Sequence, residues 1–138
     1  MFPPARLRYA VRALLVLAEG YPDALLSLRV VAAREGISEK YLEPVFAQLR
    51  RAGILTSIRG KAGGYRLKHA PEALTLYAIA GAIGHLPGGH SGRGAENESE
   101  RAIWGELRSV IERHLEAVTL ADARSLRDAG RMSGDYRI

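Results

Sequence analysis

The chain contains 138 residues with a mass of 15.0 kDa, which suits one packed domain and is too short for two ordinary ones. The formal net charge of +5 at pH 7 and the sequence pI near 9.9 favour an anionic partner. Because the sequence contains no cysteine, disulfide scaffolds, thiolate zinc sites, cysteine nucleophiles and cysteine-ligated iron–sulfur clusters are excluded.

The first predicted helix covers residues 9–19 and is apolar on nearly all sides, which is typical of a buried helix. Arg8 and Arg12 share one face of it. Ahead of the helix, Pro3 and Pro4 interrupt the stretch where a signal peptide would need a continuous apolar core. No uncharged stretch approaches the length of a membrane span, so we expect a soluble, cytoplasmic protein with no membrane partner.

Two short capped helices follow. Ser27 is expected to cap a helix that ends at Glu35, with Gly36 in the left-handed conformation after its last turn. Ser38 is expected to cap a second helix that runs to about Ala52. Two capped helices joined by a short turn that contains glycine are the signature of a helix-turn-helix.

The next segment, residues 54–68, changes from a helical to an alternating pattern around a glycine-rich tip, which predicts a β-hairpin. In its second strand Tyr65 and Leu67 face one way, whereas Arg66 and Lys68 face the other. One side of the hairpin therefore packs and the other is cationic. A helix-turn-helix followed directly by a basic hairpin is a winged helix.

The second half of the chain is predicted to contain three more helices. Thr75 should cap a helix over residues 76–83, and a long amphipathic helix should run from about Glu100 to Val118. Thr119 opens a last short helix that should end near residue 128. A solitary amphipathic helix needs another apolar surface, and a two-fold mate is its commonest source. The stripe expected to dimerise comprises Ile103, Leu107, Val110, Ile111, His114, Leu115 and Val118.

We therefore expect a mainly α fold with a small β-hairpin. Its parts are a winged helix-turn-helix DNA-binding region (residues 1–83), a flexible glycine-rich loop (84–100), a dimerisation helix with a short last helix (101–128) and a frayed tail (129–138).

Charge supports this division of the chain. Residues 1–70 carry 12 basic and 5 acidic side chains, a balance of +7, whereas residues 71–138 carry 8 and 10, a balance of −2. The anion-binding surface is therefore expected in the first half.

Three strings in this order resemble one known family: YAVRAL at residues 9–14, GIS leading to YLE at 36–43, and AGIL before RGKAGGY at 52–65. The chain resembles the Rrf-two (Rrf2) family of bacterial winged-helix transcription regulators, which includes IscR, NsrR and CymR. The similarity continues through Trp104 to about residue 128. The resemblance implies a homodimer on double-stranded promoter DNA, with each recognition helix in a major groove and each wing against the adjacent groove. Two-fold symmetry would match a palindromic operator.

At the front of the recognition helix, Lys40 should neutralise a phosphate, and Tyr41 should either bond to the DNA backbone or pack against the first helix. Glu43 could accept from a cytosine amino group, whereas Glu39 is better explained by the helix dipole. Pro44 should either kink this helix or delay its regular start. The residues of this helix expected to face DNA are Ser38, Lys40, Tyr41 and Glu43.

Arg59 is expected to contribute most to DNA binding, because it leads into a narrow glycine hairpin and arginine is the preferred reader of narrow minor grooves. Gly60, Gly63 and Gly64 should serve the turn and permit close approach to phosphates. The alternative is an ordinary solvated hairpin. The secondary phosphate contacts expected are Arg6, Arg8 and Lys61, for which a solvated face is the alternative.

Many relatives carry three cysteines in the loop before the long helix, and these hold an iron–sulfur cluster. The chain keeps the loop and lacks all three, and the resemblance places Glu98, Arg101 and Arg8 where some relatives have cluster ligands. A cationic residue is a poor metal ligand, so no cofactor is expected. The candidate ligands for another metal match no closed site in their spacing and are better explained as surface residues. They are His85, His90, Glu96 and Glu98.

The sequence thus favours a cluster-free, dimeric, sequence-specific DNA-binding regulator, specifically a repressor that occupies a promoter. One alternative is a protein-interaction adaptor that no longer reads DNA. Another is a regulator that senses a metal, a small-molecule effector or a regulatory protein partner through residues 84–100. An enzyme is disfavoured because the chain has no phosphate-binding P-loop, no nucleophile elbow and no paired carboxylates with a plausible cleft.

Overall fold

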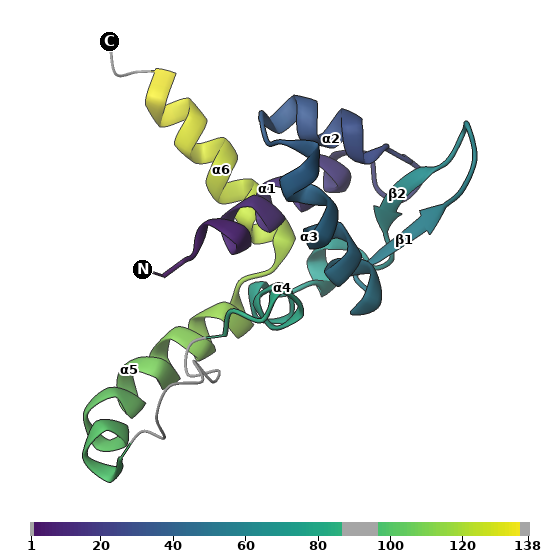
Figure 1. The fold of residues 1–138 in the computed structure, drawn as a ribbon. Coiled ribbons are helices and arrows are strands. Elements are labelled where there is room, and N and C mark those ends of the chain that lie inside the picture. Colours follow the sequence, from purple (N-terminus) through teal and green to yellow (C-terminus); the bar gives the residue numbers. More distant parts are fainter. Residues whose placement is uncertain (1, 87–96, 136–138) are drawn as a thin grey trace.

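The computed structural model describes residues 2–86 and 97–135, which form six α-helices, a β-hairpin and one short 3-10 helix (Figure 1). The expectation of a mainly α fold with a small hairpin is confirmed. No helix within the described residues is both long and apolar enough to cross a membrane. The elements are α1 (Ala5–Glu19), α2 (Leu28–Glu35), α3 (Glu39–Arg51), β1 (Leu55–Ile58), β2 (Gly64–Leu67), η1 (Pro71–Ala73), α4 (Leu76–Ile83), α5 (Glu98–Ala117) and α6 (Leu120–Asp135).

The helix-turn-helix forms as its capping residues predict. The Ser27 hydroxyl accepts from the Val30 amide at 3.1 Å, and the Ser38 hydroxyl accepts from the Tyr41 amide at 3.0 Å. Gly36 ends α2 with φ of 65°, a conformation that glycine adopts without steric cost. Gly36, which ends α2, and Ser38, which caps α3, therefore specify the turn between the two helices.

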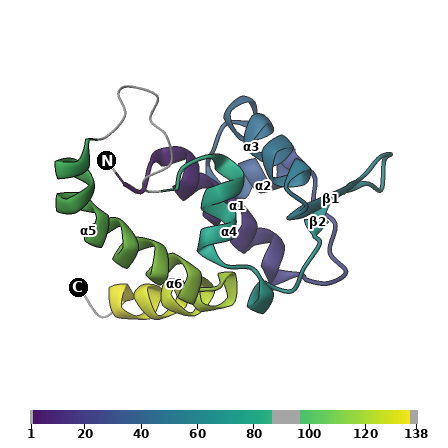
Figure 2. The same cartoon turned by 90° about the horizontal axis from the view of Figure 1, so that it is seen from below.

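The core gathers around α1, which is central in the fold and has α2, α3, α4 and α6 around it (Figure 2). Leu14 of α1 has no exposed surface, and neither do Leu42, Phe46 and Leu49 of α3. α1 begins at Ala5 rather than at residue 9, because Pro4 precedes its first turn and the residues after it are good helix formers. The predicted apolar face of α3 thus fixes the recognition helix against the rest of the domain.

The wing contains one backbone pairing that the sequence pattern does not predict. β1 and β2 pair antiparallel, with Leu55 opposite Leu67. On the other edge of β2, Tyr65 exchanges backbone hydrogen bonds with Leu26, at 2.7 and 3.0 Å. A Cβ at Gly64 would lie 2.7 Å from the Leu26 carbonyl, so this close approach requires glycine. The wing extends from the body on the side opposite α5 and α6 (Figure 1).

α5 and α6 both begin with reciprocal capping. Asn97 and Glu100 form a capping box for α5, which therefore starts at Glu98, slightly before the expected start. The predicted box between Thr119 and Asp122 is confirmed, with hydrogen bonds of 3.0 and 3.1 Å.

The expected end of the last helix near Asp128 was wrong, whereas residues 136–138 of the expected frayed tail lie outside the described residues. α6 continues to Asp135. Gly130 costs about 1 kcal/mol in a helix relative to alanine, which Ala129, Arg131 and Met132 around it tolerate as good helix formers.

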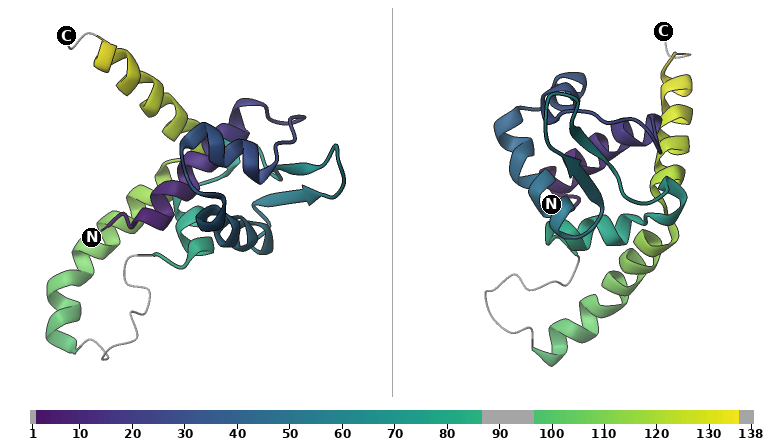
Figure 3. Two further views of the ribbon diagram at one scale, coloured as in Figure 1. Left: turned by 45° about the horizontal axis from the view of Figure 1, so that its top comes forward. Right: turned by 90° about the vertical axis from the view of Figure 1, so that its right-hand side faces the viewer.

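The junction between α5 and α6 is tied to the body of the domain. Leu120 donates to the Leu74 carbonyl at 2.7 Å, and Leu76 donates to the Val118 carbonyl at 2.9 Å. The Leu120 side chain has no exposed surface, and Arg127 of α6 pairs with Glu19 of α1 at 3.5 Å. α6 therefore packs on the winged-helix body, whereas most of α5 projects from it (Figure 3).

Candidate nucleic-acid interface

The first turn of α3 is exposed as expected. Ser38, Lys40 and Glu43 lie at the surface, and the Tyr41 side chain is 42% exposed. The Tyr41 ring also meets Tyr9 of α1 edge to face, with 5.2 Å between ring centroids. Tyr41 therefore packs against the first helix and still presents an edge to solvent, so the two readings of this residue are compatible.

Pro44 lies inside α3 and does not delay its start, since the helix begins at Glu39. Proline has no amide proton, so residue 44 cannot donate to the Lys40 carbonyl one turn earlier. Of the two expectations for Pro44, the delayed start was wrong. Glu39 forms an ion pair with Arg29 of α2 at 4.0 Å, which agrees with a structural rather than a base-reading role.

Arg12 was missed as a functional residue and connects three helices. Its Nε lies 3.0 Å from a Glu35 carboxylate oxygen, and its Nη2 donates to the Glu35 carbonyl at the end of α2. Its guanidinium carbon lies 5.4 Å from the centre of the Tyr9 ring, which in turn contacts Tyr41 of α3. We call Arg12, Glu35, Tyr9 and Tyr41 the α1 clamp. The shared face of Arg8 and Arg12 was the only signal for it in the sequence.

The α1 clamp predicts a positioning effect on DNA binding. Replacing Arg12 with alanine is expected to lower DNA affinity about three- to tenfold, because the first turn of α3 is then less well ordered before binding. The free energy of unfolding should fall by less than about 1 kcal/mol, since the ion pair is solvent-exposed. Measurement of affinity at several salt concentrations should give an unchanged salt slope.

Glu35→Gln is the matched control, because it breaks the same pair without removing a cation. The double variant Arg12→Ala with Glu35→Gln should bind no more weakly than Arg12→Ala alone. A salt slope smaller by about one in Arg12→Ala would contradict the positioning role and indicate a direct phosphate contact.

The wing tip places its two cations at the surface. Arg59 and Lys61 are exposed on either side of Gly60, which has φ of 111°. A Cβ at Gly63 would collide with the Ile58 carbonyl oxygen, so Gly63, like Gly64, packs closely on the chain's own backbone. These two glycines therefore have a structural role in the hairpin besides the predicted approach to phosphates.

The two arginines of α1 that were expected to contact phosphates have different surroundings. Arg6 is partly buried, and its Nε is enclosed with no hydrogen-bond partner among the described atoms. Arg8 is exposed and lines a cavity between α1, α4 and α5. Arg8 is thus the more accessible of the two.

The stripe along α5 is exposed over its first half. Ile103 is 63% exposed, Leu107 53% and Val110 48%, with Trp104 beside them at 53%. Ile111 and Val118 are partly buried and His114 is exposed. Leu115 differs, because it is 7% exposed and already packs against its own chain. The unpartnered part of the stripe is therefore the half that projects from the body.

Comparison with known proteins identifies regulators that have a similar sequence and the same fold. The sequence profile of the Rrf2 family, described as iron-dependent transcriptional regulator, matches residues 4–124. Protein rrf2 of Nitratidesulfovibrio vulgaris is 35% identical over 136 residues, which cover 90% of this chain and 86% of that protein. The structure of IscR from T. potens gives a TM-score of 0.75 at 31% identity, covering 94% of this chain and 88% of that one. The structure of CymR, the global cysteine regulator of B. subtilis, gives 0.76 at 30% identity, covering 91% and 98%.

The residues of this chain do not fit an iron–sulfur cluster. Such clusters are held by cysteine thiolates, and the sequence has none. Arg8 and Arg101, which the resemblance places at positions of cluster ligands in some relatives, are exposed cations. Residues 2–86 and 97–135 contain no group of three or more His, Cys, Asp or Glu side chains that could hold a metal. Of the other candidate ligands, His85 follows α4 and Glu98 begins α5, whereas His90 and Glu96 lie outside the described residues.

Proposed function

The chain belongs to the Rrf2 family of transcriptional regulators, and on that premise we propose that it is a homodimeric repressor that binds palindromic promoter sites without an iron–sulfur cluster. It is a DNA-binding winged-helix regulator and not an enzyme, as its relatives and structural neighbours are regulators. Beyond family membership, we propose four properties of this chain: it forms a homodimer, it represses transcription, it is located in the cytoplasm, and it holds no iron–sulfur cluster.

The observation that carries the proposal is the exposure of the first turn of α3 together with a cationic wing tip. The Ser38 cap and the buried face of α3 hold Lys40, Tyr41 and Glu43 at the surface. Arg59 and Lys61 lie at the end of a hairpin that extends from the body (Figure 1). A helix in a major groove with a wing beside it would let α3 read bases while the wing contacts the backbone or a minor groove.

Dimerisation is supported by the exposed half of the α5 stripe. Large apolar side chains grouped on a projecting helix mark an interaction surface, because soluble proteins seldom leave such a group in water. A two-fold arrangement would use the same stripe twice and would present two recognition helices to a palindrome. We propose repression as the outcome, since a dimer bound at a promoter excludes other proteins from it.

The proposal is tested by selecting genomic fragments with the purified protein and measuring their affinity by mobility shift. Specific retention of a palindromic fragment is expected. Arg59→Ala should weaken that binding by about 1–3 kcal/mol and reduce the salt slope by about one, because one cation in a groove is lost. Arg113→Ala, which removes an exposed arginine of α5, is the matched control and should have little effect.

Weak, salt-sensitive binding that is equal on every fragment would contradict sequence-specific regulation. Capture of a stable protein partner without salt-sensitive DNA affinity would instead select the adaptor function. An absorption spectrum of freshly purified protein tests the cluster separately, since visible iron–sulfur bands with bound iron would refute its absence.

A further inference from the structure

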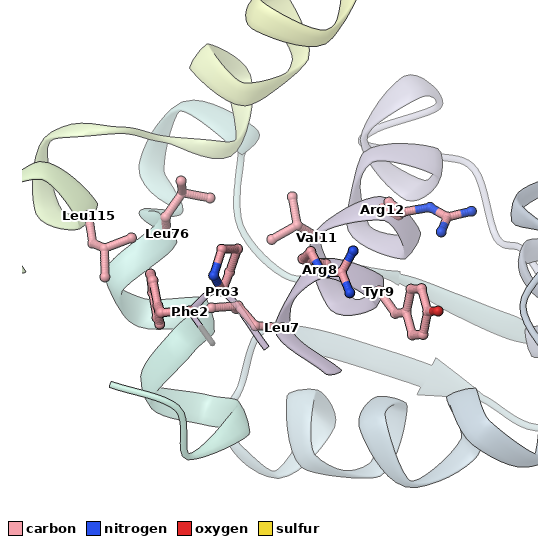
Figure 4. A pocket seen from close by; sticks show the side chains of 9 residues that line it. All are labelled: Phe2, Pro3, Leu7, Arg8, Tyr9, Val11, Arg12, Leu76 and Leu115. Carbon is pink, nitrogen blue, oxygen red and sulfur yellow. The ribbon is translucent and has the colours of Figure 1, made fainter. Parts of the chain in front are cut away.

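A cavity of about 360 Å³ lies between α1, the start of α4 and the last turn of α5 (Figure 4). Its volume falls within the range of about 300–1,000 Å³ that is common for small-molecule sites. The walls are predominantly apolar, as expected of a site that holds an apolar group. The apolar side chains that line it are Phe2, Pro3, Leu7, Val11, Leu76 and Leu115.

Two cations lie at one end of this cavity. Figure 4 shows the guanidinium groups of Arg8 and Arg12 beside Tyr9, away from the apolar end formed by Phe2 and Leu115. Arg8 is exposed and forms no ion pair with any described residue. An apolar cavity with a guanidinium group at one end complements an organic acid, whose tail is buried and whose carboxylate accepts from arginine.

The same end of the cavity adjoins the recognition helix. Tyr9 and Arg12 also line a recess of about 280 Å³ in front of the first turn of α3. Arg12 is bound there by the Glu35 carboxylate at 3.0 Å. A second carboxylate beside Arg12 would compete with Glu35 and would loosen the α1 clamp. Occupation of the cavity can therefore change how firmly α3 is held.

We propose that this cavity binds a small organic carboxylate with an apolar tail, and that the acid weakens DNA binding by drawing Arg12 away from Glu35. The inference rests on the proposed function, for which it supplies the effector class. Arg8 supplies the primary contact to the carboxylate, and Arg12 supplies the coupling to α3. Neither role depends on a metal or on the segment outside the described residues.

Binding is tested on the DNA-free, full-length protein by calorimetric titration with phenylacetate, 4-phenylbutyrate and hexanoate. At least one acid should bind with a dissociation constant below about 1 mM. Phenylacetamide, which has the shape of phenylacetate without its charge, should bind at least about tenfold more weakly, and so should each acid to Arg8→Gln. Arg113→Gln is the matched control and should bind the acids normally. Val11→Phe should also abolish acid binding, because the larger side chain would fill the cavity.

Coupling is tested by mobility shift on the selected DNA. Saturating acid should lower the affinity of the wild-type protein by up to the roughly three- to tenfold expected for Arg12→Ala, because both changes release the Glu35 contact. The same acid should have no further effect on Glu35→Gln, in which the carboxylate that competes for Arg12 is already absent. Binding of the acid with no such change in DNA affinity would overturn the effector role.

The site itself is overturned if no acid binds, or if the amide binds as tightly as the acid. It is also overturned if the acids bind only to a monomeric variant, because a second copy of the chain then covers the cavity. Because the titration contains no DNA, a failure to bind acid leaves the proposed DNA-binding function standing. That function fails only if specific DNA binding is absent.

Discussion

Replacing Leu107 with aspartate is expected to convert the proposed dimer to monomers and to weaken binding to a palindromic site by about 100-fold or more. Leu107 lies in the middle of the exposed α5 stripe and is 53% exposed in the single chain. A buried carboxylate at the centre of an apolar interface would be desolvated without a partner. In a monomer each recognition helix binds its half-site independently. The affinity that the dimer gains by holding the second helix next to the second half-site is then lost. Sedimentation and mobility shift measure the two effects.

Leu126→Asp is the matched control, because Leu126 lies on α6 and is 67% exposed. It should leave both the oligomeric state and DNA affinity unchanged. Dissociation by Leu126→Asp together with an intact dimer in Leu107→Asp would place the interface on α6 instead. A monomeric wild-type protein that still binds a palindrome tightly would contradict the dimer altogether.

Replacing Phe46 with alanine should have the largest effect on stability, lowering the free energy of unfolding by about 3–5 kcal/mol. Phe46 has no exposed surface, and its ring meets Tyr65 of the wing edge to face with centroids 4.8 Å apart. The substitution therefore leaves a void between α3 and β2, where the recognition helix supports the wing. Urea unfolding at a fixed chain concentration measures the change, since unfolding of a dimer depends on concentration.

Phe46→Leu keeps most of the apolar volume and should cost clearly less than Phe46→Ala. The only other phenylalanine, Phe2, is 41% exposed, and Phe2→Ala should change stability by about 0.5 kcal/mol or less. Equal effects of Phe46→Ala and Phe2→Ala would show that the contact between α3 and the wing does not support the fold.

Most of the secondary structure was predictable because its signals are local. The caps at Ser27, Ser38, Thr75 and Thr119 each join a side chain to a backbone amide three residues later, so both partners lie in one short string. The apolar stripe of α3 likewise follows from helical spacing. The end of α6 was missed because a glycine in a helix is a weak signal that neighbouring residues can outweigh.

The candidate site was predictable only in part. The positions of Lys40, Tyr41 and Arg59 at the surface follow from the helix-turn-helix and the hairpin, and their contacts with DNA stay predictions. Arg12 was missed because its partner Glu35 is distant in the sequence and carries no motif. Such a pair forms only after α1 and α2 have packed.

The sequence by itself determined a basic first half, the helix-turn-helix, the hairpin and the absence of cysteine ligands, because composition, periodicity and capping need no knowledge of distant residues. Only the tertiary structure decided that Leu26 pairs with Tyr65, that α6 packs on the body and that Tyr9 and Arg12 stand between a cavity and α3. These contacts join segments far apart in the chain, and the burial of apolar side chains brings them together without leaving a pattern in any one segment.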